Sequence, residues 1–120
     1  MVDEASTDGF MHTDLWLAIE KDNPARLAAL LSAGVPPTYD SADGWTPLHH
    51  AVDVEGDAYS QDRIPCDLRL VRLVLEAGAD VGAVYTARGR RKTPLDLATR
   101  YGHDAAVNAI TTAGGKRADQ

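Results

Sequence analysis

Two adjacent histidines, His49 and His50, are the residues whose type most directly suggests chemistry. They follow a Thr-Pro-Leu segment in DGWTPLHHAV (43–52), and imidazole side chains serve proteins as metal ligands and as general bases. Neighbouring residues on a helix point about 100° apart, so this pair cannot chelate one ion from one face. Helical metal pairs use i, i+4 spacing instead. The two histidines therefore do not predict a metal site.

No other arrangement of residue types predicts an active site. The serines and threonines lie outside any G-x-S-x-G turn, and the sequence has neither a G-x-G-x-x-G pattern nor a P-loop. Alternate positions carry Asp53, Glu55 and Asp57, which invites a calcium interpretation. An EF-hand loop requires a carboxylate at its twelfth position, however, and that position holds Ile64. We expect no catalytic residue, no metal and no cofactor.

The composition is that of one soluble globular domain. The chain has 120 residues, of which 44% are hydrophobic and 25% are charged. The sequence has no apolar run long enough to span a membrane, its start is too acidic for a signal peptide, and a lone Cys66 suits a reducing compartment. These features predict a cytoplasmic protein. An excess of arginine over lysine hints at a GC-rich bacterial genome.

Charge is distributed unevenly along the chain. The net charge is −6 overall, which argues against nucleic-acid binding. Residues 1–80 hold 15 acidic and 5 basic side chains, whereas residues 81–120 hold 3 acidic and 7 basic ones. We expect the two ends of the molecule to present different surfaces to a partner.

Three segments of the chain are similar to one another. Each predicts a short helix, a break, a second helix with an apolar stripe, and a stop at a glycine. The aligned segments are DLWLAIEKDNPARLAALLSAGV (14–35), WTPLHHAV (45–52) with LVRLVLEAGADVGA (70–83), and KTPLDLATRYGHDAAVNAITTAGG (92–115).

Prolines and glycines mark the predicted helix boundaries. Pro47 and Pro94 stand where a helix begins, because a first-turn residue needs no amide donor. Gly34, Gly78 and Gly114 follow the second helices, where a left-handed turn favours a residue without Cβ. No single unit can bury its own apolar stripe, so we expect the units to stack.

The segments TPLHHAV, LVLEAGADVGA and TPLDLATRYGH resemble the ankyrin repeat. The resemblance covers about residues 14–115 and implies an all-α solenoid of stacked helix-turn-helix units with β-hairpin-like fingers. It also implies a non-enzymatic scaffold that binds another protein. The expected organisation is a flexible N-terminus (1–12), one domain (13–115) with repeats at about 13–42, 43–83 and 84–115, and a flexible tail (116–120).

The resemblance also assigns roles to single residues. It implies that His49 bonds to Thr46 of the turn, with Asp96 as an alternative acceptor in the last unit. His50 falls at a variable position of the inner helix, on the surface that ankyrin proteins turn toward partners. Thr111 stands where the middle unit has Leu75, so the last unit has the more polar outer face expected of a cap.

The middle unit contains an insertion. Thr46 and Gly78 are 32 positions apart, against 21 for Thr93 and Gly114, which places about 11 extra residues near 54–65. We expect a long acidic loop between the inner and outer helices. It is either a passive insertion or an acidic arm for a basic partner.

The finger VYTARGRRK (84–92) is also extended, and three arginines crowd it. These arginines are either a run of solvated charges with no binding role or a projecting cluster that binds carboxylates or phosphates. The preceding finger offers Tyr39 and Asp40. The candidate partner-binding residues are Tyr39, Asp40, His50, Asp53, Tyr85, Arg88, Arg90 and Arg91, flanked by Trp16, Glu20, Arg100 and Tyr101.

Several functions remain open within this interpretation. The sharper hypothesis is a bacterial immunity protein that neutralises a cognate toxin, because small acidic proteins of ankyrin type occur in toxin systems and this chain resembles them. The alternative is a regulatory adaptor for an endogenous enzyme or transcription factor. A metal-dependent accessory protein that uses the acidic loop is the weakest reading. We expect a monomer.

Overall fold

A computed structural model of the chain describes residues 14–37, 44–62, 68–87 and 89–118. It is mostly helical, with one small antiparallel hairpin, as the sequence predicts. Residues 14–20 belong to an N-terminal helix. The elements that follow are α2 (Pro24–Ser32), α3 (Pro47–Asp62), α4 (Arg69–Glu76), β1 (Tyr85–Ala87), β2 (Arg90–Lys92), α5 (Pro94–Tyr101) and α6 (Asp104–Thr112).

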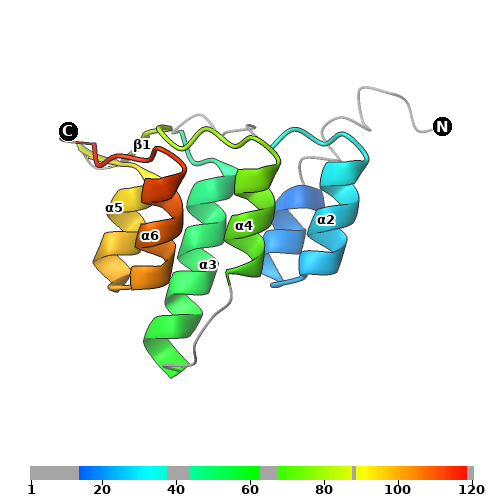
Figure 1. Cartoon of the computed structure of the whole chain (residues 1–120), viewed down its shortest axis with the longest axis horizontal. Helices are drawn as coiled ribbons and strands as arrows, with labels where there is room; N and C mark the ends of the chain where they lie inside the picture. The colour runs from blue at the N-terminus through cyan, green and yellow to red at the C-terminus, as the bar shows by residue number, and fades with distance from the viewer. Residues whose placement is uncertain (1–13, 38–43, 63–67, 88, 119–120) are drawn as a thin grey trace.

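The helices stand side by side as a stack of helix pairs (Figure 1). The helix α3 contacts both its own partner α4 and the next inner helix α5, while α4 contacts α2 and α6. Each pair therefore covers the apolar stripe of its neighbour, and one core runs through the stack. The largest fully buried hydrophobic side chains are Leu15, Ile19, Leu27, Val35, Leu48, Val52, Leu68, Leu70, Val71, Val74 and Ile110.

The three outer helices end in the same way. Gly34, Gly78 and Gly114 have φ angles of 102°, 98° and 100°, in the left-handed region. In the first stop the Gly34 amide bonds to the carbonyl three residues back, and Val35 N donates to Leu30 O at 3.1 Å. The other two stops repeat this pattern, which is the Schellman motif. The glycine stops that the sequence predicts are confirmed.

The prediction of a long acidic loop near 54–65 is wrong for most of these residues, because they belong to a helix. The helix α3 runs from Pro47 to Asp62 and has 16 residues, whereas α5 has 8. In Figure 1 the extra turns of α3 project beyond the other helices, on the side away from the hairpin. The insertion therefore lengthens the inner helix, because tertiary contacts made by residues 53–57, described below, hold that stretch in helical form.

The hairpin and the tail lie together at the other edge of the stack. Strand β1 pairs with β2 in the register Tyr85 to Lys92 and Ala87 to Arg90. The tail expected to be flexible begins with a bonded segment, because Thr93 Oγ1 donates to Lys116 O at 2.6 Å and Ala118 N donates to Asp96 Oδ2 at 3.0 Å.

Candidate functional site

His49 holds two repeats together. Its ring is fully buried, and Nδ1 lies 2.8 Å from Thr46 Oγ1 and 3.2 Å from Thr46 N. Because the Thr46 amide can only donate, Nδ1 accepts, and the proton sits on Nε2. That Nε2–H donates to Lys92 O at 2.9 Å, across to the following finger. The structural role expected for His49 is confirmed, and the contact with Lys92 is an addition to it.

Asp96, which matches His49 in the last unit, makes the equivalent contact with Thr93. Its Oδ2 accepts from Thr93 N at 2.9 Å, while Thr93 Oγ1 accepts from Asp96 N at 3.2 Å, which is a capping box. The same Oδ2 accepts from Ala118 N. The head of α3 therefore donates to the following finger through His49, whereas the head of α5 both donates to the backbone of residues 116–118, through Thr93, and accepts from it, through Asp96. The expectation that Asp96 acts as an acceptor is confirmed.

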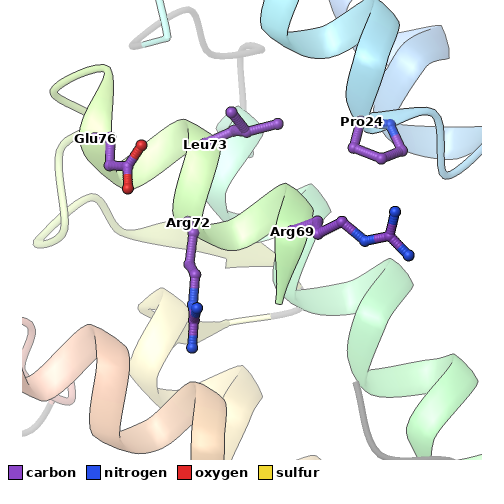
Figure 2. A pocket seen from close by; sticks show the side chains of 5 residues that line it. All are labelled: Pro24, Arg69, Arg72, Leu73 and Glu76. Atoms are coloured by element: carbon purple, nitrogen blue, oxygen red, sulfur yellow. The ribbon is translucent and has the colours of Figure 1, made fainter. Parts of the chain in front are cut away.

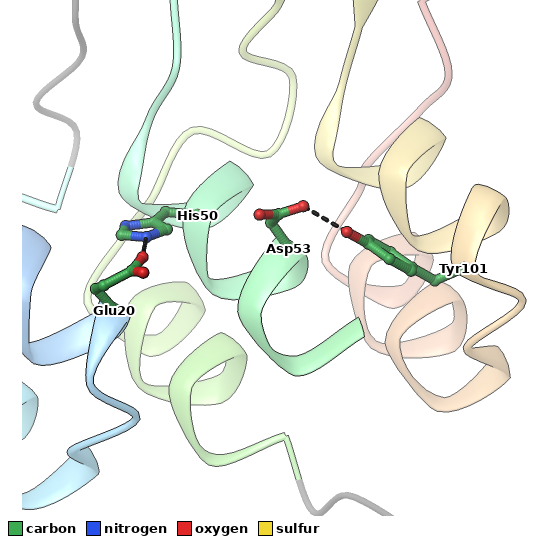
Figure 3. Close-up of polar contacts among 4 residues, drawn as sticks. All are labelled: Glu20, His50, Asp53 and Tyr101. Carbon is green, nitrogen blue, oxygen red and sulfur yellow. Dashed lines mark hydrogen bonds and ion pairs between the residues drawn. The ribbon is translucent and has the colours of Figure 1, made fainter. Parts of the chain in front are cut away.

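A surface formed by the three inner helices gathers several of the candidate residues. We call it the inner-helix surface, and its members are Trp16, Glu20, His50, Asp53, Asp57, Arg100 and Tyr101. Figure 3 shows two contacts that cross it, one between the N-terminal helix and α3 and one between α3 and α5. Trp16 is 46% exposed, the largest exposed hydrophobic side chain among the described residues.

The first contact joins His50 to the preceding unit. Its Nε2–H donates to Glu20 Oε1 at 2.7 Å (Figure 3), and the Trp16 ring stacks on the imidazole with centroids 4.8 Å apart. His50 is therefore only 4% exposed. His50 is a candidate partner-binding residue, but the neighbouring unit supplies the side chains that cover it. A partner on this face would meet Trp16 and Glu20.

The second contact joins Asp53 to the following unit. Tyr101 Oη donates to Asp53 Oδ1 at 2.5 Å (Figure 3). Burial raises the pKa of the Tyr101 hydroxyl, and the bond and negative charge of Asp53 raise it further. The ring lies against Gly56, where a Cβ would stand 2.4 Å from Tyr101 Cδ2. Asp53 and Gly56 thus fasten the extended part of α3 to α5.

Glu55 has a buried, structural role that the sequence did not predict. The sequence predicts that it lies in an acidic loop, but it is only 4% exposed. Its carboxylate accepts from Leu70 N at 2.9 Å and from Val71 N at 3.2 Å. The N-cap residue of α4, Leu68, adopts a left-handed φ of 59° and makes no side-chain cap. Glu55 therefore caps α4 from the preceding helix.

Basic side chains gather at the opposite edge. Arg90 and Arg91 are exposed on β2, and the bonded tail brings exposed Lys116 and Arg117 beside them. Arg91 Nη2 donates to Ala118 O at 3.4 Å. We call Arg90, Arg91, Lys116 and Arg117 the basic edge. The match of Gly114 to Gly78 is a sequence signal that could have predicted an ordered segment after the last helix, where a flexible tail (116–120) was expected.

The remaining partner-binding candidates add little to the description of a binding surface. Tyr39, Asp40 and Arg88 lie outside the described residues. Tyr85, the first residue of β1, is partly buried, and its ring packs edge-on against Trp45 with centroids 4.7 Å apart. His103 is buried at the start of α6, and this burial lowers its pKa.

Two hollows lined by described residues lie away from the inner-helix surface. One, of about 310 Å³, lies between α2 and α4 and is lined by Pro24, Arg69, Arg72, Leu73 and Glu76. Figure 2 shows Leu73 directed toward Pro24 while Arg72 points away from it. The other, of about 470 Å³, lies on the last helix pair.

The described residues hold no group of three or more His, Cys, Asp or Glu side chains placed to bind one metal ion. The same part of the chain contains no helix with the length and apolar character needed to cross a membrane.

Comparison with protein families gives one match. Residues 43–85 match the family model described as Ankyrin repeat. The matched segment spans α3, α4 and the first residue of β1. None of the curated proteins matches the chain.

Proposed function

This chain is an ankyrin repeat protein, a protein-binding scaffold. On that premise we propose that its partner protein lies across the inner-helix surface. The partner carries basic side chains where it contacts that surface. The observation that carries the proposal is one exposed aromatic side chain, Trp16, beside a row of carboxylates. Exposed tryptophan is a frequent centre of binding energy at protein interfaces.

Charge supports a basic partner. The acidic members of the inner-helix surface are Glu20, Asp53 and Asp57, its one arginine is Arg100, and Glu20 and Asp57 are exposed. The two cross-repeat bonds fix Asp53 and Glu20 before a partner arrives. A surface that is already ordered loses little conformational entropy on binding, and complementary charge speeds association.

The finer proposal is that the partner is a toxin and the chain is its immunity protein. An acidic, preformed surface is suited to cover the basic groove of a nuclease or an arginine-rich active site. If a neighbouring gene encodes a toxic protein, co-expression of the two proteins should restore growth and yield a stable complex. Growth arrest without a complex would refute the immunity role and leave the binding role intact.

The binding role has its own test with a matched pair of variants. Asp57→Lys reverses an exposed charge on α3, and Glu76→Lys reverses an exposed charge at the end of the outer helix α4. A partner captured from source-cell lysate by the unmodified protein should be lost with Asp57→Lys and retained with Glu76→Lys. Retention by both variants would refute the inner-helix surface as the contact.

A further inference from the structure

The last helix pair ends in a groove that no described residue covers. Its lining is Leu95, Thr99, Val107, Thr111, Gly115, Lys116 and Arg117, with a volume of about 470 Å³. We call it the end groove. In the middle unit Leu75 packs against the core, whereas Thr111, at the matching position, is exposed. The groove is therefore polar at its sides but keeps an apolar floor of Leu95 and Val107.

The charge of the end groove is the reverse of that of the molecule. The chain carries −6, yet the charged residues that line the groove are Lys116 and Arg117, and none of its lining residues is acidic. The backbone that carries these two cations is fixed by the Thr93 bond to Lys116 O and the Ala118 bond to Asp96. The Asp96 carboxylate is engaged in these bonds and in the helix cap.

We infer that the end groove is a second contact surface and binds an acidic segment of the partner protein, with an apolar side chain on Leu95 and Val107 and carboxylates on Lys116 and Arg117. This inference rests on the proposed binding function and adds the chemistry of a second contact. A partner that is basic over the inner helices and acidic in one segment would bind in a single orientation, because the two surfaces have opposite charge.

Two other occupants fit less well. Two-fold pairing of two copies through this groove would bring the Lys116 and Arg117 pairs of both copies together, which is repulsive. A nucleic acid would meet a floor of aliphatic side chains with no aromatic ring among the lining residues for base stacking. It would also approach a protein of net charge −6.

The direct test uses a fluorescein-labelled peptide, Glu-Leu-Glu-Glu-Leu-Glu, and fluorescence anisotropy with the full chain. The unmodified protein should bind it more tightly than a peptide of glutamates alone, because the leucines occupy the floor. The double variant K116E/R117E should weaken binding about tenfold or more, since it replaces two attractions by repulsions. The matched control R69E/R72E makes the same charge change on α4 and should change affinity less than about twofold.

Equal weakening in the two double variants, or no binding to the unmodified protein, would overturn the inference. Sedimentation of the unmodified protein adds a further arm, because a dimer abolished by K116E/R117E would assign the groove to a second copy instead. The proposed binding function is tested separately, by the capture experiment that compares the unmodified protein with Asp57→Lys. A lysate partner that is lost with Asp57→Lys but fully retained by K116E/R117E would refute the end groove alone.

Discussion

Replacement of Glu55 by alanine should destabilise the protein by about 3 kcal/mol. Glu55 is buried on α3 and accepts the amides of Leu70 and Val71, the second and third residues of α4. In the alanine variant both amides lose their acceptor at a helix start that has no side-chain cap of its own. The perturbation therefore acts on α4, although the substitution lies in α3.

The magnitude follows from two bonds made by one carboxylate. A hydrogen bond to a charged acceptor contributes about 1.5–3 kcal/mol, and loss of an ordinary N-cap costs about 0.5–2 kcal/mol. Two full bonds would give more than 3 kcal/mol, but fraying of the first turn of α4 lets water reach the amides. Glu55→Gln keeps one acceptor oxygen and loses the charge that favours a helix N-terminus, so about 1–1.5 kcal/mol is expected.

Urea unfolding followed by far-UV circular dichroism measures these differences. Asp57→Ala is the matched control, because Asp57 is an exposed carboxylate two residues further along α3, and its loss should change stability by no more than about 0.5 kcal/mol. Equal losses for the alanine variants at positions 55 and 57 would refute the capping argument. If Glu55→Gln and Glu55→Ala lowered the free energy of unfolding equally, the stabilisation assigned to the remaining acceptor oxygen would be refuted.

Three further outcomes follow from the contacts of α3 and α6. Gly56→Ala should lower the urea midpoint, with a loss of about 1–2 kcal/mol, since its Cβ would meet the Tyr101 ring and this outweighs the helix-propensity gain of about 1 kcal/mol. His49→Asp should lose about 2–3 kcal/mol by the same assay, because a carboxylate would face the Lys92 carbonyl in place of a donor. Burial lowers the pKa of His103 in the folded state, so the urea midpoint should fall as pH drops below the ordinary value of 6.5.

Each of these three has its own control. In a Tyr101→Ala background, Gly56→Ala should become stabilising, and a persistent loss would locate the clash elsewhere. His49→Asn keeps an N–H donor and should lose less stability than His49→Asp; the reverse order would contradict the assigned proton on Nε2. A His103→Asn variant should show a flatter acid limb, and an unchanged pH profile would exclude His103 as its source.

The regular parts of the fold could be predicted because their signals are local. A proline in the first turn and a glycine at the left-handed stop act within a few residues of themselves, and Gly34, Gly78 and Gly114 adopt the expected conformation. The bond between Thr46 and His49 spans three residues and could also be predicted. Each of these signals needs no knowledge of what packs against it.

The insertion could not be placed because its signals are not local. Asp53, Glu55 and Gly56 read as an acidic loop with a helix-weakening glycine, since their bonding partners are Tyr101 and the start of α4. Tertiary contact overrides propensity in such a segment. The burial of His50 could not be predicted for a related reason: Trp16, which covers it, belongs to the preceding unit, 34 positions away.

The backbone that completes each helix head lies later in the sequence than the head itself. The head at His49 is completed by Lys92, and the head at Thr93 and Asp96 is completed by residues 116–118. During synthesis each head therefore leaves the ribosome before the backbone that completes it. A unit can therefore complete its head only after the segment that follows it has been synthesised, and a chain ending at residue 115 would lack the backbone partners of Thr93 and Asp96.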